Sequence, residues 1–334
     1  MLEKRAVIID TDPGDDDAAS MLWVLANPKM FNVLGVTVTN GNVGVDKCAI
    51  NALRTLEVAG RPEIPVYLGA YRPLVRPSIE ASWIHGKDGF GDLGFPMPKL
   101  APSQGHASVE MVRMAKQASS PVTILALGPL TNIALAILLD KDFASSVKEV
   151  IFMGGAVRVS GNQSPRASYN VMVDPEAAKV VYNSGIPVVQ IGLDVCDLVT
   201  QEVSDLDEIG KAGTTTTDFL TTLLSFRREK AVKVIKDAAG NVVRTIKASE
   251  QVSSRKDGIG LNDLTATAYL IDASWFKTMY VTADVAIGGI CDGETVIDYK
   301  GLWGREPNLH YAFDVISRKV VDRWVADMIA YRPN

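Results

Sequence analysis

Five aspartates lie close together near the start of the chain: Asp10, Asp12, Asp15, Asp16 and Asp17. They follow a short apolar run and precede an amphipathic one. Ionised carboxylates packed this closely and partly shielded from water repel one another, so some of them would have to bind protons. A hard cation with oxygen ligands relieves that repulsion, and Ca²⁺ and Mg²⁺ prefer such ligands. The spacing therefore predicts a metal site or catalytic carboxylates here.

Helix capping is the structural alternative for these acids. Acidic side chains stabilise the N-terminus of a helix, and a helix pattern starts at Ala18. Capping accounts for one or two acids but not for five. The Pro13-Gly14 pair turns the chain, so Asp12 and the acids at 16 and 17 can face one point from opposite sides. Metal binding or catalysis is the favoured interpretation.

The elements that must position these acids alternate along the chain. Runs rich in β-branched residues predict strands at Ala6–Asp10, Asn32–Thr39, Pro65–Leu68, Pro121–Leu127, Val147–Met153 and Pro187–Leu193. Amphipathic runs between them predict helices at Ala18–Ala26, Val45–Val58, Asn132–Leu139 and Pro175–Ser184. This rhythm is typical of an α/β fold, Rossmann-like, with a mostly parallel central sheet. Ligands bind outside the carboxyl ends of such strands, where the acidic loop falls.

The second half of the chain departs from this rhythm. Residues Asp205–Arg228 are predicted as helix, and Lys233–Lys247 as an inserted hairpin arm. Extra C-terminal strands are predicted at Met279–Ile287, Thr295–Tyr299 and Leu309–Phe313, followed by a helix to about Ile329. We expect a single domain over residues 1–334, with the hairpin as an insertion.

Several motifs in order resemble the nucleoside hydrolase family, of the inosine-uridine preferring type. The first is Asp10-Thr11-Asp12-Pro13-Gly14-x-Asp16-Asp17-Ala18. The others follow predicted strands: Val38-Thr39-Asn40-Gly41-Asn42, Gly128-Pro129-Leu130-Thr131-Asn132, Met153-Gly154-Gly155, and the run from Asn170 to Ala178. The resemblance covers nearly the whole chain, and it implies the nucleoside hydrolase fold and the hydrolysis of N-ribosidic bonds.

The resemblance also implies roles for individual residues. Asp12, Asp17, Asp263 and the backbone carbonyl of Leu127 would bind Ca²⁺, and Asp12 would also take a proton from a calcium-bound water. The ribosyl group would pass through an oxocarbenium-like state. Asp10 would support the loop. The implied ribose-binding residues are Asp16, Asn42, Met153, Asn162 and Asn170.

One departure from the family concerns the acid that protonates the leaving base. Many members have His immediately before the last metal-binding Asp, but this chain has Asn262, whose amide cannot deliver a proton. His85 is the substitute candidate, because its loop reaches the site in relatives. Trp83 beside it is a candidate platform for the base, the alternative being a packing anchor. His106 and His310 are interpreted as structural.

A second departure is Ser168, where relatives commonly have a Glu that holds the ribose 5′-hydroxyl. With Arg158 and Arg166 in the same loop, this substitution suggests the hypothesis that a 5′-modified or anionic ribosyl compound is the substrate. A solvated arginine loop is the simpler alternative. Asp174 and Glu176 are interpreted as helix caps.

Two other functions remain open from the sequence. A haloacid dehalogenase-type phosphatase also starts with strand-Asp-x-Asp, with Asp10 as nucleophile, but Pro13-Gly14 and the later motifs do not fit it. A non-catalytic or atypical binder of nucleosides would keep the pocket without the leaving-group acid. Asn262 and Ser168 favour this binder, whereas retention of all the aspartates disfavours it.

Composition narrows the setting. The net charge of −5 gives no reason to expect nucleic acid or an anionic membrane as a partner. The three cysteines are far apart in a chain with no signal-peptide pattern, so we expect a cytoplasmic protein. The resemblance implies a homodimer or homotetramer acting on a small nucleoside.

Overall fold

The structure is a computed structural model that describes residues 4–229, 232–236, 240, 242–247 and 258–333. The strands are β1 (Arg5–Thr11), β2 (Phe31–Val38), β3 (Val66–Leu68), β4 (Val122–Ala126), β5 (Val147–Met153), β6 (Val188–Ile191), β7 (Gln201–Glu202), β8 (Val232–Lys236), β9 (Val242–Lys247), β10 (Gly258–Ile259), β11 (Phe276–Val285), β12 (Thr295–Asp298) and β13 (Leu309–Val315). The helices are α1 (Asp15–Leu25), α2 (Val45–Val58), α3 (Ser82–His85), α4 (Ala107–Gln117), α5 (Thr131–Leu139), α6 (Tyr169–Val173), α7 (Pro175–Tyr182), α8 (Leu193–Cys196), α9 (Val203–Gly210), α10 (Thr215–Glu229), α11 (Asn262–Ile271) and α12 (Ser317–Ala330).

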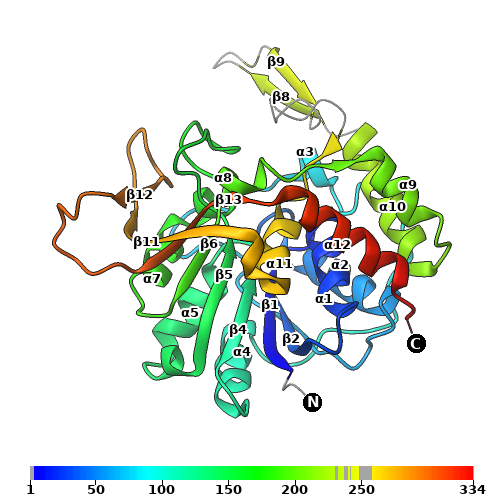
Figure 1. Cartoon of the computed structure of the whole chain (residues 1–334), viewed down its shortest axis with the longest axis horizontal. Helices are drawn as coiled ribbons and strands as arrows, with labels where there is room; N and C mark the ends of the chain where they lie inside the picture. The colour runs from blue at the N-terminus through cyan, green and yellow to red at the C-terminus, as the bar shows by residue number, and fades with distance from the viewer. Residues whose placement is uncertain (1–3, 230–231, 237–239, 241, 248–257, 334) are drawn as a thin grey trace.

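Nine strands form one sheet in the order β12-β11-β13-β6-β5-β4-β1-β2-β3 (Figure 1). Every neighbouring pair from β13 to β3 is parallel, whereas β11 runs antiparallel to both β13 and β12. The prediction of an α/β fold with a mostly parallel sheet and extra C-terminal strands is confirmed.

The chain changes direction across the sheet at β1. It passes from β1 to β2 and β3 on one side, and then returns to β4, β5 and β6 on the other. Loops that leave adjacent strands toward opposite faces open a crevice at their carboxyl ends. The crevice here lies between the ends of β1 and β4, so the acidic loop after β1 is at its centre.

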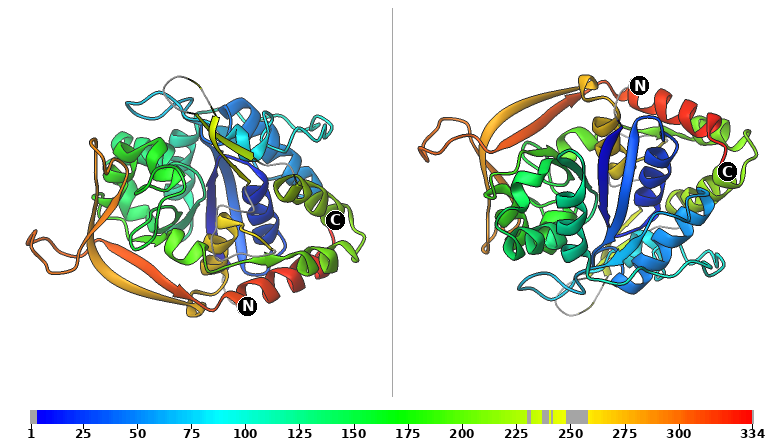
Figure 2. Two further views of the ribbon diagram at one scale, coloured as in Figure 1. Left: turned by 90° about the horizontal axis from the view of Figure 1, so that it is seen from above. Right: turned by 90° about the horizontal axis from the view of Figure 1, so that it is seen from below.

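The sheet is covered on both faces, which explains why β1 is apolar almost throughout. Successive side chains of a strand point to opposite faces. Ile8 accordingly packs with Met111 and Ile133 of α4 and α5. Ile9 packs on the other side with Leu22 and Leu264 of α1 and α11. Figure 2 shows the two groups of helices on either side of the sheet.

The predicted helix over Asp205–Arg228 is wrong in one respect, because the structure has two helices there, α9 and α10. Gly213 between them has φ of +59°, which breaks a helix. The Thr214 hydroxyl then accepts a hydrogen bond from Thr217 N at 3.2 Å and starts α10. The predicted strand over Pro187–Leu193 is also too long, since β6 ends at Ile191 and Leu193 begins α8.

Strands β8 and β9 pair antiparallel, apart from the main sheet. Residues 237–239 and 241 of the predicted hairpin turn lie outside the described residues. Strand β8 contacts α3, and the pair lies over the middle of the molecule when seen from above (Figure 2, left). Among the described helices, none is both long and apolar enough to cross a membrane.

Candidate active site

The five aspartates span the end of β1, the loop after it and the first turn of α1, and all of them are buried. Asp17 caps α1, because its carboxylate accepts hydrogen bonds from Gly14 N at 3.0 Å and from the Thr11 hydroxyl at 2.5 Å. Asp15 accepts a hydrogen bond from the neighbouring Asp16 N at 3.0 Å, which does not cap the helix. Helix capping therefore accounts for Asp17 and leaves the other acids for a different role.

Asp12 is held from several sides. Its Oδ2 accepts a hydrogen bond from Asn42 N at 2.8 Å, and the Asn42 amide donates to Asp12 O at 3.0 Å. A Cβ at Gly41 would overlap Asp12 Oδ2, and one at Gly128 would lie 2.5 Å from Oδ1. The glycines of two loops thus leave just enough room for this carboxylate.

Replacing Gly41 with Ala should therefore impair the site without unfolding the protein. The new methyl group would displace the Asp12 carboxylate, and misplacing a reacting group by about 1 Å costs about 10²-fold in rate. We expect kcat/KM to fall by that factor with an unchanged circular dichroism spectrum. Gly44→Ala is the matched control, because its Cβ would have no atom closer than 3.9 Å. Equal activity in the two variants would contradict the tight fit around Asp12.

Asp10 lies beneath the loop, in a buried polar network. Its Oδ1 accepts hydrogen bonds from the Thr37 hydroxyl at 2.7 Å and the Asn132 amide at 2.9 Å. Asn132 Oδ1 in turn accepts from Ala70 N at 2.9 Å. Burial raises the pKa of Asp10 to about 7, against the lowering effect of these hydrogen bonds. Asp10 thus joins β1 to the loops that follow β3 and β4.

Three carboxylates can share one cation. Oxygen atoms of Asp16, Asp17 and Asp263 all lie within 4.8 Å of one another. Burial, followed by repulsion from Asp17, raises the pKa values of Asp12 and Asp263 well above the usual range. Oxygen-only donors that repel one another in a buried place fit a hard divalent cation.

Three more of the predicted residues are joined by hydrogen bonds. The Asn170 amide donates to Leu127 O at 2.5 Å and to Met153 O at 2.9 Å. Asn170 lies on α6, whereas Leu127 and Met153 lie at the carboxyl ends of β4 and β5. Asn162 is less direct, because its side chain accepts a bond from Tyr169 N at 2.7 Å and so supports α6.

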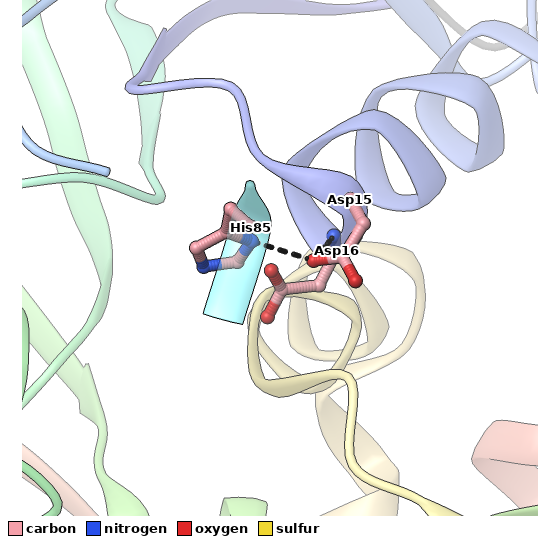
Figure 3. Close-up of side chains that lie close together, drawn as sticks. All are labelled: Asp15, Asp16 and His85. Atoms are coloured by element: carbon pink, nitrogen blue, oxygen red, sulfur yellow. Dashed lines mark hydrogen bonds and ion pairs between the residues drawn. The ribbon is translucent and has the colours of Figure 1, made fainter. Parts of the chain in front are cut away.

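A second charged group adjoins the acidic loop (Figure 3). His85 Nδ1 lies 2.8 Å from Asp15 Oδ1, and a Cβ at Gly14 would lie 2.5 Å from the same nitrogen. Arg227 Nη1, from α10, lies 3.4 Å from Asp15 Oδ1 and 3.2 Å from Asp16 Oδ2. Burial alone would raise the pKa of Asp15, but the charges of Arg227 and His85 outweigh it and lower the pKa to about 2.

The remaining predicted residues lie at the ends of two helices. Trp83 is half-buried on α3, two residues before His85. Asn262 is the first residue of α11 and directly precedes Asp263. Its carbonyl oxygen lies 3.7 Å from Cys196 Sγ.

The family description that matches this chain is "Inosine-uridine preferring nucleoside hydrolase", over residues 7–322. The chain belongs to this nucleoside hydrolase family. It is 35% identical to the pyrimidine-specific ribonucleoside hydrolase RihA of Salmonella schwarzengrund, over 95% of this chain and 96% of that protein. The plant nucleoside hydrolase PpNRh1 has a similar structure (TM-score 0.87, 28% identity, 98% and 100% coverage). So does the purine-preferring ribonucleoside hydrolase from Gardnerella vaginalis (TM-score 0.87, 26% identity, 98% and 99% coverage).

Membership makes the chain an N-glycosyl hydrolase, as the motifs predicted. It also excludes the haloacid dehalogenase-type phosphatase that the sequence left open as an alternative. The family is metal-dependent, and the buried acids of this nucleoside hydrolase are able to hold an ion.

Sequence reasoning missed two residues of this nucleoside hydrolase, Asp15 and Arg227. Asp15 occupies the position written x in the first motif, to which the resemblance assigns no role, but its carboxylate lies 2.8 Å from His85 Nδ1. Arg227 lies far along the chain, in a helix that gave no local signal. Only the folded structure shows that the buried guanidinium of Arg227 pairs with both Asp15 and Asp16.

Both arginines behind the hypothesis of an anionic 5′ group have partners within the protein. Arg166 pairs with Glu294, and Arg158 lies over the ring of Tyr311, 5.8 Å from its centroid. Ser168 is fully buried, and its hydroxyl accepts a hydrogen bond from Gly155 N at 2.7 Å. Asp174 caps α7 by accepting from Ala177 N at 3.0 Å, as predicted.

Proposed function

We propose that this chain hydrolyses the N-ribosidic bond of ribonucleosides, giving ribose and a free base, with Ca²⁺ as its ion. The observation that carries the proposal is the gathering of buried carboxylates at the crevice between β1 and β4. The names of its relatives support ribonucleosides as the substrate class, and they include both pyrimidine and purine preferences.

As the family resemblance implies, Asp12, Asp17, Asp263 and the carbonyl of Leu127 would hold the cation, and Asp16, which lies near Asp17 and Asp263, would be left for the sugar. Four oxygen donors leave room for water and ribose hydroxyls, since Ca²⁺ takes six to eight oxygen ligands. A bound calcium ion supplies positive charge that makes water more acidic and orients the sugar.

The side chains of the chain would perform the remaining steps. Asp12, positioned by Asn42 and the two glycines, would accept the proton of the attacking water. Asp16 would accept a hydrogen bond from the ribose 2′-hydroxyl, while Asn42 and Asn170 hold the walls of the ribose pocket. The negative field of the carboxylates would also favour positive charge on the sugar as the bond breaks.

The stability of the metal-free protein should fall as the pH rises from about 4 to about 7. The pKa of Asp10 is 3.8 in a free side chain and about 7 in the fold. Between these values the folded state binds more protons than the unfolded state, so raising the pH favours unfolding. The raised pKa values of Asp12 and Asp263 act in the same direction. The lowered pKa of Asp15 opposes this effect only below its free value of 3.8.

Melting temperatures measured in chelator at pH 5 and pH 8 would check this prediction. We expect a lower Tm at pH 8, and a larger increase on adding Ca²⁺ at pH 8 than at pH 5. Ca²⁺ should also act at lower concentration than Mg²⁺. A Tm in chelator that does not change with pH would contradict the proposed repulsion between the buried acids.

The direct test is release of reducing sugar from a panel of uridine, cytidine, inosine and adenosine. Activity that chelator removes and Ca²⁺ restores would establish the proposal, and the panel would rank the bases. Tight binding of nucleosides by calcium-loaded protein without release of ribose would instead support a binding function.

We also propose a homo-oligomer. Large apolar side chains are exposed on and beside the antiparallel end of the sheet, including Ile290, Leu302 and Trp303. Exposed apolar groups of this kind are typical of interaction surfaces. Light scattering would test the proposal, and the 36.0 kDa mass of one chain at micromolar concentration would contradict it.

A further inference from the structure

The leaving base is a problem for this site. When the C1′–N bond breaks, its electron pair stays on the base nitrogen, so the departing base is negatively charged unless a group stabilises it. Asn262 cannot supply a proton, and His85, the substitute that the sequence suggests, has its Nδ1 2.8 Å from Asp15 Oδ1. If the chain hydrolyses ribonucleosides as proposed above, another group can stabilise the departing base.

Arg227 is a cation fixed inside the site. Its side chain is only 8% exposed. The neighbouring Phe226 packs against the loop after α3, since a Cβ at Gly91 would lie 2.5 Å from the Phe226 ring. Helix α10 also packs on α1, which begins with the acidic loop. The helix end that carries Arg227 is therefore held in place against two parts of the site.

The hydrogen bonds of Arg227 are incomplete. Its Nη1 approaches Asp15 and Asp16, but no described residue gives this nitrogen a well-directed hydrogen bond. Asp15 Oδ2 likewise has no hydrogen-bond partner within the described part of the chain, whereas His85 Nδ1 lies 2.8 Å from Asp15 Oδ1. Buried polar groups normally have such partners. A purely structural ion pair would be expected to satisfy its donors, so these atoms are suited to receive a ligand.

Asp16 fixes where that ligand would lie. Its carboxylate belongs both to the group with Asp17 and Asp263 and to the group with Asp15 and His85. The Arg227 guanidinium lies 3.2 Å from the same carboxylate, so if Asp16 binds the 2′-hydroxyl, this cation borders the place of C2′, and C1′, which carries the base, is bonded to C2′. We propose that Arg227 is a catalytic residue that stabilises the negative charge on the leaving base.

The reaction balances without a proton from the arginine. The C1′–N bond breaks and its electron pair moves onto the base nitrogen, where guanidinium N–H groups donate hydrogen bonds to the anion. The hydroxide part of water bonds to C1′, and its proton goes to Asp12. The base then takes a proton from solvent, and Asp12 returns its own. Arg227 stays charged throughout, since a guanidinium does not deprotonate in proteins.

A comparison of two leaving groups tests this role. Uridine and inosine need help to leave, whereas the nitrophenolate of 4-nitrophenyl β-D-ribofuranoside is stable without it. In Arg227→Gln we expect kcat for the nucleosides to fall about 10²- to 10³-fold, the usual effect of removing one stabilising donor. The kcat for the nitrophenyl riboside should fall less than about threefold, and KM should change little. Arg227→Lys should show an intermediate loss with the same dependence on the leaving group.

Several outcomes would overturn the proposal. Equal losses on both kinds of substrate would show that Arg227 only positions Asp16 or the ribose. Unchanged nucleoside hydrolysis would show that it has no role. If Arg227→Gln does not fold, Arg227→Lys retains the charge and decides by the same comparison.

Controls separate this test from the proposed function. Arg113→Gln removes an exposed arginine that pairs with Glu110 on α4, and it should leave all rates unchanged. Wild-type protein that is inactive on every riboside would refute the proposed hydrolysis itself. Active wild-type protein with a loss that does not depend on the leaving group would refute only the role of Arg227.

Discussion

Replacing Asp12 with Asn should lower kcat/KM for every ribonucleoside by at least about 10³-fold, because proton transfer by a positioned base contributes 10²–10⁴-fold and the same side chain would bind the ion. The amide has nearly the same shape, and its oxygen can still accept the bond from Asn42 N. The variant should therefore fold. Reducing-sugar assays in saturating Ca²⁺ would measure the loss.

The stability of the same variant provides a second readout. Burial and the repulsion from Asp17 and Asp16 raise the pKa of Asp12, so a neutral side chain at this position should relieve that repulsion. In chelator at pH 8 the Tm of Asp12→Asn should equal or exceed that of the wild type. Asp205→Asn is the matched control, a buried acid that pairs with Arg318 away from the site, and it should keep its activity. More than a tenth of wild-type activity in folded Asp12→Asn would rule out Asp12 as the base.

The second large effect concerns the ribose 2′-hydroxyl. We expect 2′-deoxyuridine and 2′-deoxyinosine to react at least about 10³-fold more slowly, in kcat/KM, than the ribonucleosides. A site built to bind a hydroxyl leaves buried polar groups unpaired when that hydroxyl is absent, which rejects such analogues by up to 10⁴–10⁵-fold. Asp16 would lose its partner on the sugar here, and it is buried beside Asp15 and Asp17.

The 5′-deoxy analogues are the control for this comparison. Ser168 is the residue that the family resemblance places near the 5′-hydroxyl, and its own hydroxyl already accepts a hydrogen bond from Gly155 N. Loss of the 5′-hydroxyl should therefore cost much less, about tenfold or under, as expected for one neutral hydrogen bond. Similar rates for ribo- and 2′-deoxynucleosides would exclude Asp16 as a ligand of the sugar.

The sequence predicted the fold well where patterns are local. The apolar run before Asp10 and the acids after it indicated a strand buried on both faces that ends at a ligand site. The alternation of Ile8 and Ile9 between two cores shows why that pattern is informative. Helices α9 and α10 were joined in the prediction because the amphipathic pattern continues past Gly213, while the positive φ that separates them is a property of the folded backbone.

The candidate site was predictable only in part. The motifs predicted Asp12, Asp17 and Asp263, and the structure places all three among the same buried charges. Arg227 was missed because an arginine in an amphipathic helix usually lies on the surface. Its burial depends on the packing of α10 against α1, which no local pattern reveals. The hypothesis of an anionic 5′ group treated Arg166 as a free cation. Its partner Glu294 lies more than a hundred residues away in the chain, so no local pattern reveals the pair.

The strands β8 and β9 lie in the chain between two helices that both pack on α1. Helix α10 carries Arg227 and α11 carries Asp263. Because each of these helices packs on α1, its position does not depend on the length of the segment between them. Doubling such a segment costs only about 0.6 kcal/mol in closure entropy. We therefore expect that a foreign recognition element inserted between β8 and β9 would bring the enzyme to a chosen surface and leave Arg227 and Asp263 in position, provided that the contact of β8 with α3 is kept.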